Sequence, residues 1–351
     1  MRKTGIVRDR RYLDHITSDF HPENPHRLEV IYGMLDDNDM EERFIEIPPR
    51  FATEQEIGLV HAPEYISRVA ATADMSHAML DPDTCTSPRS YDAARLAVGG
   101  VLESIDAIIS GDADNSFAFV RPPGHHAESD RGMGFCLFNN VAIGARYAIH
   151  KYSLERILIV DWDLHHGNGT QNTFYCDPTV LYFSIHQYPY YPGTGSLNET
   201  GSGDGTGFTV NIPLSGGQGD TDYLLILERV LSPICLQFKP QFILISAGFD
   251  IYFKDPLGNM KVTPTGFSRL ARLLLETAEH SCGGNILFVL EGGYHLEGLK
   301  ESVKAVLNEL TGSSFFAKEE AKRADTKSSS VEELIERVIH VHENFWDFSK
   351  V

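Results

Sequence analysis

The chain has 351 residues, of which 42% are hydrophobic and 23% charged, so it is long enough to bury a large core. Its formal net charge of −19 argues against sequence-independent binding to nucleic acid, which needs a basic surface to release counterions. No apolar stretch is long enough to span a bilayer and no hydrophobic region follows the charged N-terminus, so the sequence predicts a cytoplasmic protein without membrane association.

The five cysteines are scattered and form no CxxC pair, which indicates neither a disulfide framework nor a thiolate zinc site. We expect most of them to be small core residues. The acidic charge would suit a cationic ligand, and it is equally typical of an ordinary soluble protein.

Short apolar runs rich in β-branched and aromatic residues alternate with longer helix-like stretches. The predicted strands are 116–120, 157–160, 180–185, 242–246 and 286–290. The predicted helices are 91–109, 222–237 and 266–280. Strands that alternate with helices in this way predict a parallel sheet covered on both faces.

Polar or aromatic residues follow each of the five predicted strands. The segments are 121–140, 161–169, 186–196, 247–258 and 291–299. Ligand sites of open α/β sheets lie outside the carboxyl ends of the strands, so one pocket is expected to collect groups from all five segments.

The sequence also predicts a loop, a linker and a C-terminal helix. The glycine-rich stretch 193–207 lacks the ending of a phosphate-binding loop and is predicted to be a mobile rim loop. Residues 317–330 are charged and serine-rich, and a helix is expected from 331 to about 345, with Ser330 and Glu333 in capping-box spacing. Its apolar stripe is formed by Leu334, Ile335, Val338 and Ile339, which indicates packing or contact with a second subunit of a homo-oligomer.

The segment DWDLHHGNGT after the second strand predicts a metal site. If the strand continues, Asp161, Asp163 and His165 share one face, while Trp162 and Leu164 point into apolar packing on the other. Two carboxylates that close repel each other unless a cation or a proton separates them. A divalent ion accepts both carboxylate and imidazole, and the alternative is a polar surface turn.

Asp250 follows the fourth strand in the sequence Ser-Ala-Gly-Phe-Asp and is the candidate third ligand. An Asp2His set leaves coordination positions open for water and a carbonyl oxygen, which is typical of a catalytic site. Such a set could hold Zn²⁺ or Fe²⁺. Without Asp163 and His165, a lone aspartate there would more often be a turn residue.

The tandem histidines His125 and His126 follow a stiff Arg-Pro-Pro-Gly turn. One could take a proton from attacking water and one could supply a proton to a leaving amine; they could also be metal ligands or part of a polar loop. Asp161 is placed to orient one of the two rings. Tyr294, after two glycines, could donate a hydrogen bond to a carbonyl oxygen that gains charge, or could cap the sheet.

Six motifs carry a family resemblance. RPPGHH, GFCLFNN, DWDLHHGNGTQ, PGTG, AGFD and EGGY occur in this order, and the similarity extends from about His21 to Leu310. The chain thereby resembles the histone deacetylase and acetylpolyamine amidohydrolase family. The resemblance implies a single α/β domain of the arginase type with an eight-stranded parallel sheet flanked by helices. It also implies a deacetylase catalytic domain over 1–312, followed by a charged linker over 313–330 and a C-terminal helix within 331–351.

The resemblance assigns roles to the motif residues. It implies Zn²⁺ ligation by Asp163, His165 and Asp250, an acid/base pair of His125 and His126, and a carbonyl-polarising Tyr294. Phe135 and Tyr191 resemble the aromatic walls of an acyl-lysine channel. Gly134 resembles the residue whose carbonyl oxygen accepts the substrate amide hydrogen, and Asp83 resembles the rim aspartate that binds a peptide backbone. Structural K⁺ or Na⁺ sites are implied at two sets of positions: Asp161, Asp163, His165, Ser184 and Ile185, and Phe174, Asp177, Val180 and Phe208.

The resemblance also ranks the candidate functions. Asn168 stands where class I deacetylases have an aspartate, so the chain looks more like class II and its bacterial relatives, and Tyr294 predicts activity. The favoured reaction is zinc-dependent removal of acyl groups from the ε-amine of lysine in proteins or peptides by metal-activated water. An acetylpolyamine is the alternative substrate, disfavoured because neutral Leu257 stands at the position of an acidic gatekeeper. A non-catalytic acyl-lysine binding module and an arginase-like dinuclear manganese hydrolase are weaker alternatives.

Overall fold

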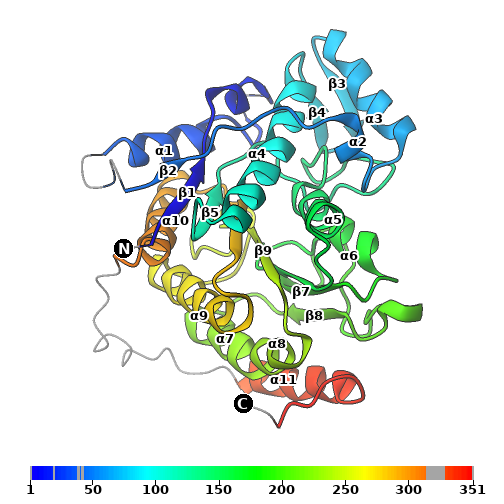
Figure 1. The fold of residues 1–351 in the computed structure, drawn as a ribbon, viewed down its shortest axis with the longest axis vertical. Coiled ribbons are helices and arrows are strands. Elements are labelled where there is room, and N and C mark those ends of the chain that lie inside the picture. Colours follow the sequence, from blue (N-terminus) through cyan, green and yellow to red (C-terminus); the bar gives the residue numbers. More distant parts are fainter. Residues whose placement is uncertain (1, 19, 38–39, 41–42, 314–328, 350–351) are drawn as a thin grey trace.

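One parallel sheet organises the chain. In the computed structural model, which describes residues 2–18, 20–37, 40, 43–313 and 329–349, eight strands form this sheet in the order β2-β1-β5-β10-β9-β6-β7-β8 (Figure 1). All seven neighbouring pairs are parallel. The predicted fold class, an eight-stranded parallel sheet flanked by helices, is therefore confirmed.

The five strands predicted from the sequence are the five in the middle of the sheet. The strands are β1 (Thr4–Val7), β2 (Ile45–Glu46), β5 (Asn115–Ala118), β6 (Ile157–Asp161), β7 (Val180–Gln187), β8 (Thr209–Leu214), β9 (Phe242–Ala247) and β10 (Ile286–Leu290). Every residue of β5, β6, β7, β9 and β10 is buried, which explains why apolar residues predominate in these strands taken together. A separate antiparallel hairpin consists of β3 (Ala78–Asp81) and β4 (Thr84–Thr86).

Helices cover both faces of the sheet. They are α1 (His26–Leu35), α2 (Glu54–Ile57), α3 (Pro63–Ala70), α4 (Ser90–Ser110), α5 (Asn140–Tyr152), α6 (Asn168–Phe174), α7 (Asp220–Ile226), α8 (Ser232–Phe238), α9 (Pro264–Cys282), α10 (Leu296–Leu310) and α11 (Ser329–His342). The pair α4 and α5 packs against one face, and the pair α9 and α10 packs against the other (Figure 1). The predicted helix 222–237 is interrupted by a π-helical turn over Leu227–Leu231, just before Pro233, whose nitrogen cannot donate.

Most of the cysteines are buried, as the sequence predicted for small core residues. Cys85, Cys136 and Cys235 are buried, Cys282 is half-buried and Cys176 is exposed, and all five are free. Within the described residues, none of the helices is both long enough and apolar enough to cross a membrane.

The C-terminal helix α11 packs on the edge of the sheet, beside β8. Its predicted apolar stripe is correct for Leu334, Ile335 and Val338, which are buried, while Ile339 is half-buried. The helix begins at Ser329, so Ser330 lies inside its first turn rather than ahead of it. The predicted linker falls mostly on 314–328, outside the described residues.

Two aromatic residues after α11 fix the end of the loop before β8. The Trp346 indole Nε1 donates to the Gly207 carbonyl oxygen at 2.8 Å, and the Phe345 ring lies against the same glycine. Gly207 has a φ of +92°, and a Cβ there would lie 2.6 Å from the Phe345 ring. The glycine-rich segment that was predicted to be a rim loop is thus anchored at its far end by the C-terminal segment.

The burial of His342 in α11 should make the folding stability of the protein depend on pH. Its side chain is fully buried, neither ring nitrogen has a hydrogen-bond partner among the described residues, and burial lowers its pKa from 6.5 to about 4. The unfolded chain therefore binds a proton more readily, and stability is lost as the pH falls from 6.5 towards 4. His342→Leu should remove about 2 kcal/mol of the stability difference between pH 8 and pH 5, measured by urea unfolding.

The control for this prediction is His340→Leu, on the same helix, whose side chain is 82% exposed. This variant should keep the wild-type pH dependence. An unchanged pH dependence in His342→Leu would contradict the assignment of the effect to burial.

Candidate functional site

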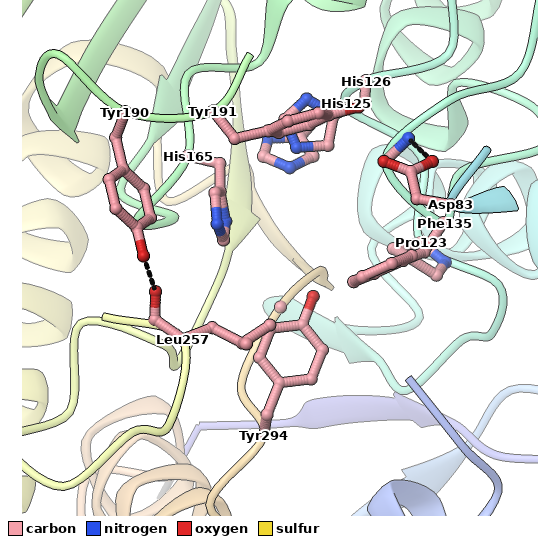
Figure 2. A pocket seen from close by; sticks show the side chains of 12 residues that line it. Asp83, Pro123, His125, His126, Phe135, His165, Tyr190, Tyr191, Leu257 and Tyr294 are labelled. Carbon is pink, nitrogen blue, oxygen red and sulfur yellow. Dashed lines mark hydrogen bonds between the residues drawn. The ribbon is translucent and has the colours of Figure 1, made fainter. Parts of the chain in front are cut away.

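The carboxyl ends of the five central strands surround one cavity, as predicted. Its volume is about 330 Å³. It is lined by Pro123, His125, His126, Gly134 and Phe135 after β5, His165 after β6, Tyr190 and Tyr191 after β7, Leu257 after β9, Gly292 and Tyr294 after β10, and Asp83 from the β3–β4 turn (Figure 2). Phe135, Tyr191 and Tyr294 give this cavity a largely aromatic wall.

Three side chains at the inner end of the cavity can hold a metal ion. Asp163, His165 and Asp250 each offer one ligand atom, and these atoms all lie within 4.8 Å of one another. His165 Nδ1 is 3.2 Å from Asp163 Oδ1 and 3.1 Å from Asp250 Oδ2. The structure therefore brings together the three residues that the sequence predicted as ligands.

The route by which they converge differs from the prediction. Strand β6 ends at Asp161, so Asp163 and His165 do not lie on one face of a continuing strand. Instead the chain turns: Asp163 N donates to Asp161 Oδ1 at 3.1 Å, and His165 N donates to Asp163 Oδ1 at 2.9 Å. The side chain of each aspartate thus accepts a hydrogen bond from the backbone N–H two residues later. These bonds fix the positions of the next two candidate ligands, Asp163 and His165.

The residues fit a divalent cation. Asp163 and Asp250 are 1% exposed or less, and burial of two neighbouring carboxylates without a counter-charge is costly. Burial and the charge of Asp163 raise the pKa of Asp250 to about 7. A cation between the two carboxylates and the neutral imidazole would remove this repulsion.

Backbone passes close to these carboxylates because glycines stand beside them. A Cβ on Gly248 would lie 2.2 Å from Asp163 Oδ2, and a Cβ on Gly292 would lie 2.4 Å from Asp250 Oδ2. Gly292 N donates to Asp163 Oδ2 at 2.8 Å. Both carboxylates are held in place by these contacts.

The tandem histidines have different partners. His125 Nδ1 is 3.0 Å from Asp161 Oδ2, as predicted for the orienting aspartate, and His125 Nε2 is 3.7 Å from Asp163 Oδ1. Burial alone would lower the pKa of His125, but the charges of Asp163 and Asp161 outweigh burial and raise it to about 10. His126 Nδ1 instead lies 2.8 Å from Asn168 Oδ1, the partner that marked class II character. Burial, with the neighbouring His125 and His165, holds the pKa of His126 well below its ordinary value.

Glu291 holds the tandem-histidine turn, a role that the sequence analysis missed. It is fully buried, and its Oε2 accepts from Gly124 N at 2.7 Å and His125 N at 3.2 Å. Burial raises its pKa to about 7. The Glu-Gly-Gly-Tyr motif pointed to this residue, but only the fold shows that β10 lies next to β5.

Tyr294 points its hydroxyl into the cavity (Figure 2). Its backbone N donates to Asp255 Oδ2 at 2.7 Å, and the Arg27 guanidinium lies 5.1 Å from its ring centroid. Burial holds the pKa of the phenol well above its ordinary value, so the hydroxyl keeps its proton near neutral pH. Asp255 is thus a further residue of the site that the sequence analysis did not identify.

The residues predicted to line the channel also lie at the cavity. Phe135 has a φ of +69°, an uncommon conformation for a residue with a side chain, and follows Gly134 with a φ of +56°. Gly134 N donates to Asp83 Oδ1 at 2.9 Å, and Phe135 N donates to Thr84 Oγ1 at 3.0 Å. The β3–β4 turn therefore holds this strained pair, which aims the Phe135 ring across the channel.

Comparison with known proteins agrees with this geometry. The sequence model of the histone deacetylase domain matches residues 21–310. The chain belongs to the histone deacetylase family. A probable deacetylase of Archaeoglobus fulgidus is 38% identical over 98% of both chains. Human Polyamine deacetylase HDAC10 is 43% identical over 83% of this chain and 44% of its own length. The solved HDA15 HD domain has a TM-score of 0.91 and 39% identity over 98% of this chain and 95% of that chain.

Membership in this family makes the chain a hydrolytic deacetylase, as predicted. Several relatives are much longer proteins: the chain spans 62% of Histone deacetylase 15 of Arabidopsis thaliana and 41% of Histone deacetylase HDA1 of Candida albicans. The part that this chain shares with these longer relatives includes the histone deacetylase domain.

Both predicted monovalent-cation sets include residues of β7, namely Ser184 and Ile185 in the first set and Val180 in the second. In the first set, Asp161 at the end of β6 is the register partner of Ser184 on β7. In the second set, Asp177 N donates to the Phe174 carbonyl oxygen at 3.0 Å, and Phe208 accepts from Tyr182 N at 2.9 Å. Arg146 and Thr179 already contact the Asp177 carboxylate. Cation binding at both sets stays a prediction.

Gly248→Ala tests the ligand geometry without changing a ligand. The added methyl group would collide with Asp163 Oδ2, so the affinity for a divalent metal ion should fall about tenfold or more. The measurement is metal content after equilibrium dialysis, with circular dichroism as the check on folding. Gly33→Ala on α1, where an added Cβ would meet no neighbouring side chain or segment within 4 Å, is the matched control and should bind the metal as the wild type does. Wild-type affinity in Gly248→Ala would show that Asp163 is not a ligand.

Proposed function

We propose that this chain is a metal-dependent deacylase that hydrolyses the amide of acylated lysine in proteins or peptides. The observation that carries the proposal is the Asp163–His165–Asp250 donor set at the inner end of an aromatic channel that also contains two histidines and a tyrosine hydroxyl. Zn²⁺ is the metal we favour, and Fe²⁺ suits the same donors. A bound divalent ion would supply Lewis acidity for the acyl carbonyl and for the attacking water.

The protein's own groups handle the proton. His126, neutral because of burial and the charge of His125, takes a proton from the attacking water and later gives it to the departing amine. His125, held protonated between Asp161 and Asp163, supplies positive charge beside the reaction centre. The proton taken from water is thus the proton given to the amine, and His126 is the only protein group whose protonation state changes.

Tyr294 stabilises the oxygen that gains charge. Its hydroxyl stays protonated and can donate a hydrogen bond to the carbonyl oxygen as the tetrahedral intermediate forms. Phe135 and Tyr191 would hold the aliphatic stem of the lysine between them, and the Gly134 carbonyl would accept the amide hydrogen. Asp83 at the mouth would bind the peptide backbone.

Acyl-lysine fits the channel better than a polyamine does. Leu257 presents an apolar side chain, and its carbonyl oxygen already accepts from the Tyr190 hydroxyl at 2.9 Å. Among the described residues that line the cavity, Asp83 is the one carboxylate outside the metal set, and its Oδ1 accepts from Gly134 N and Thr84 Oγ1. A second ammonium group of a polyamine would therefore find no free carboxylate at Leu257.

Acetylated polyamines remain the second candidate. Two observations favour them: the 43% identity to human Polyamine deacetylase HDAC10 and the net charge of −19, which attracts cationic substrates. A non-catalytic binding module and a dinuclear manganese hydrolase have less support, because binding needs no general base and because the residues described offer one three-ligand group.

Tyr294→Phe tests the role of the hydroxyl. Removing one donor to the developing oxyanion should lower kcat about 10² to 10³-fold with zinc content and KM nearly unchanged. Steady-state turnover of a fluorogenic acetyl-lysine peptide is the measurement. Tyr190→Phe, which loses only the bond to Leu257 at the mouth, is the control and should retain most of kcat. Full activity in Tyr294→Phe would refute the role of the phenol.

A substrate comparison tests the choice between the two candidates. The zinc-loaded enzyme should have a higher kcat/KM for an acetyl-lysine peptide than for N-acetylputrescine or acetylspermidine. The reverse preference would overturn the argument from Leu257 and assign the enzyme to polyamine deacetylation. Absence of turnover with all three substrates would reject both.

A further inference from the structure

Asn168 lies between the second tandem histidine and a buried carboxylate. Its Oδ1 is 2.8 Å from His126 Nδ1, and its Nδ2 donates to Glu128 Oε1 at 2.6 Å. Asn168 is 3% exposed and Glu128 8% exposed, so water does not replace either bond readily. A chain of three side chains therefore connects Glu128 to His126.

Glu128 is itself held by amide donors. Asn172 Nδ2 donates to its Oε1 at 2.9 Å and to its Oε2 at 3.1 Å. Its backbone N donates to the Arg131 carbonyl oxygen at 2.9 Å. Among the described residues, no lysine or arginine forms an ion pair with Glu128, so its acceptor capacity is directed at the two asparagine amides.

The chemistry of these groups permits one arrangement of protons. A carboxylate only accepts hydrogen bonds, so Asn168 must turn its NH2 group towards Glu128. Its carbonyl oxygen then faces His126, and that oxygen can only accept, so His126 Nδ1 must carry the hydrogen. In a neutral imidazole the lone pair is then on Nε2, the nitrogen to which no described residue is hydrogen-bonded in this lined cavity.

We propose that Glu128 is a positioning residue that acts through Asn168 to fix His126 as the Nδ1-protonated tautomer, with its Nε2 lone pair available to take a proton. This inference rests on the proposed function, in which His126 is the base. It adds a residue that touches neither substrate nor metal, and it explains why an asparagine can serve as the partner of His126.

Glu128→Gln removes the acceptor-only carboxylate that fixes the orientation of Asn168, with little change in the shape of the side chain. The amide introduced at 128 can present either its oxygen or its NH2 group, so Asn168 can turn over and offer NH2 to His126 Nδ1. The competing tautomer then places the hydrogen on Nε2, where it blocks the base. We expect kcat to fall about tenfold or more, within the range that a general base contributes, with KM and zinc content unchanged.

The direct measurement is ¹⁵N NMR of the imidazole nitrogens in the zinc-loaded protein. His126 should show hydrogen on Nδ1 in the wild type and a mixture of tautomers, or hydrogen on Nε2, in Glu128→Gln. A structural role alone would not move this signal. A single Nδ1-protonated tautomer together with wild-type kcat in Glu128→Gln would overturn the proposal.

A double variant provides the rescue. In Asn168→Asp combined with Glu128→Gln, the carboxylate introduced at 168 accepts from both neighbours, and the amide introduced at 128 donates to it. The wild-type tautomer and most of kcat should return. If Glu128→Gln fails to fold, this double variant decides: a folded protein with hydrogen on Nε2 would overturn the proposal.

Asn172→Ala is the matched control, since it removes a donor to Glu128 but leaves the Asn168 bond, and its His126 tautomer should be that of the wild type. The proposed function and the proposed role of Glu128 can be refuted independently of each other. If the zinc-loaded wild type turns over no acyl-lysine substrate, the proposed function fails, while the NMR measurement still reports on the tautomer.

Discussion

Two buried carboxylates facing one imidazole are the constraint on which the site depends. Asp163 and Asp250 come from loops after neighbouring strands, β6 and β9, and both are almost completely buried. Water cannot solvate their charges, so the surrounding backbone and either a cation or a bound proton must compensate them. The turn from Asp161 to His165, the glycines at 248 and 292, and the donation from Gly292 N all serve this need.

The segment after β10 joins the parts of the site. The side chain of Glu291 holds the tandem-histidine turn, Gly292 N holds Asp163, and the Gly293 carbonyl oxygen accepts from Arg27 Nε at 2.7 Å. Arg27 also contacts the Glu291 carbonyl oxygen and lies beside the Tyr294 ring. Four consecutive residues thus position the tandem histidines, the Asp163 carboxylate and the Tyr294 phenol relative to one another.

The sequence predicted the centre of the sheet better than its edges. The five predicted strands are fully buried and contain runs of apolar residues, whereas β2 has two residues, both exposed, and no apolar pattern. The ligand residues could be found because metal chemistry restricts side-chain types. Their geometry could not, because strand β6 ends at Asp161, four residues before His165, the last residue that the predicted strand face included.

Residues that hold other residues of the site in place are harder to recognise in the sequence. Asp255, Glu128 and Glu291 are buried acids whose partners are backbone or amide groups far away in sequence, and no spacing rule connects them. Asn168 was noticed only because the family resemblance gives a contrasting residue at its position. Long-range adjacency, set by the strand order, is the information that a single sequence lacks.

The position of β10 has a consequence for how the site responds to thermal fluctuation. This strand lies between β5 and β9 in the interior of the sheet, so freeing the segment that follows it requires much of the core to open. Its amide hydrogens should therefore exchange with solvent at rates close to those of global unfolding. Destabilising changes elsewhere would then reduce the amount of folded enzyme before they distort the geometry of the enzyme that remains.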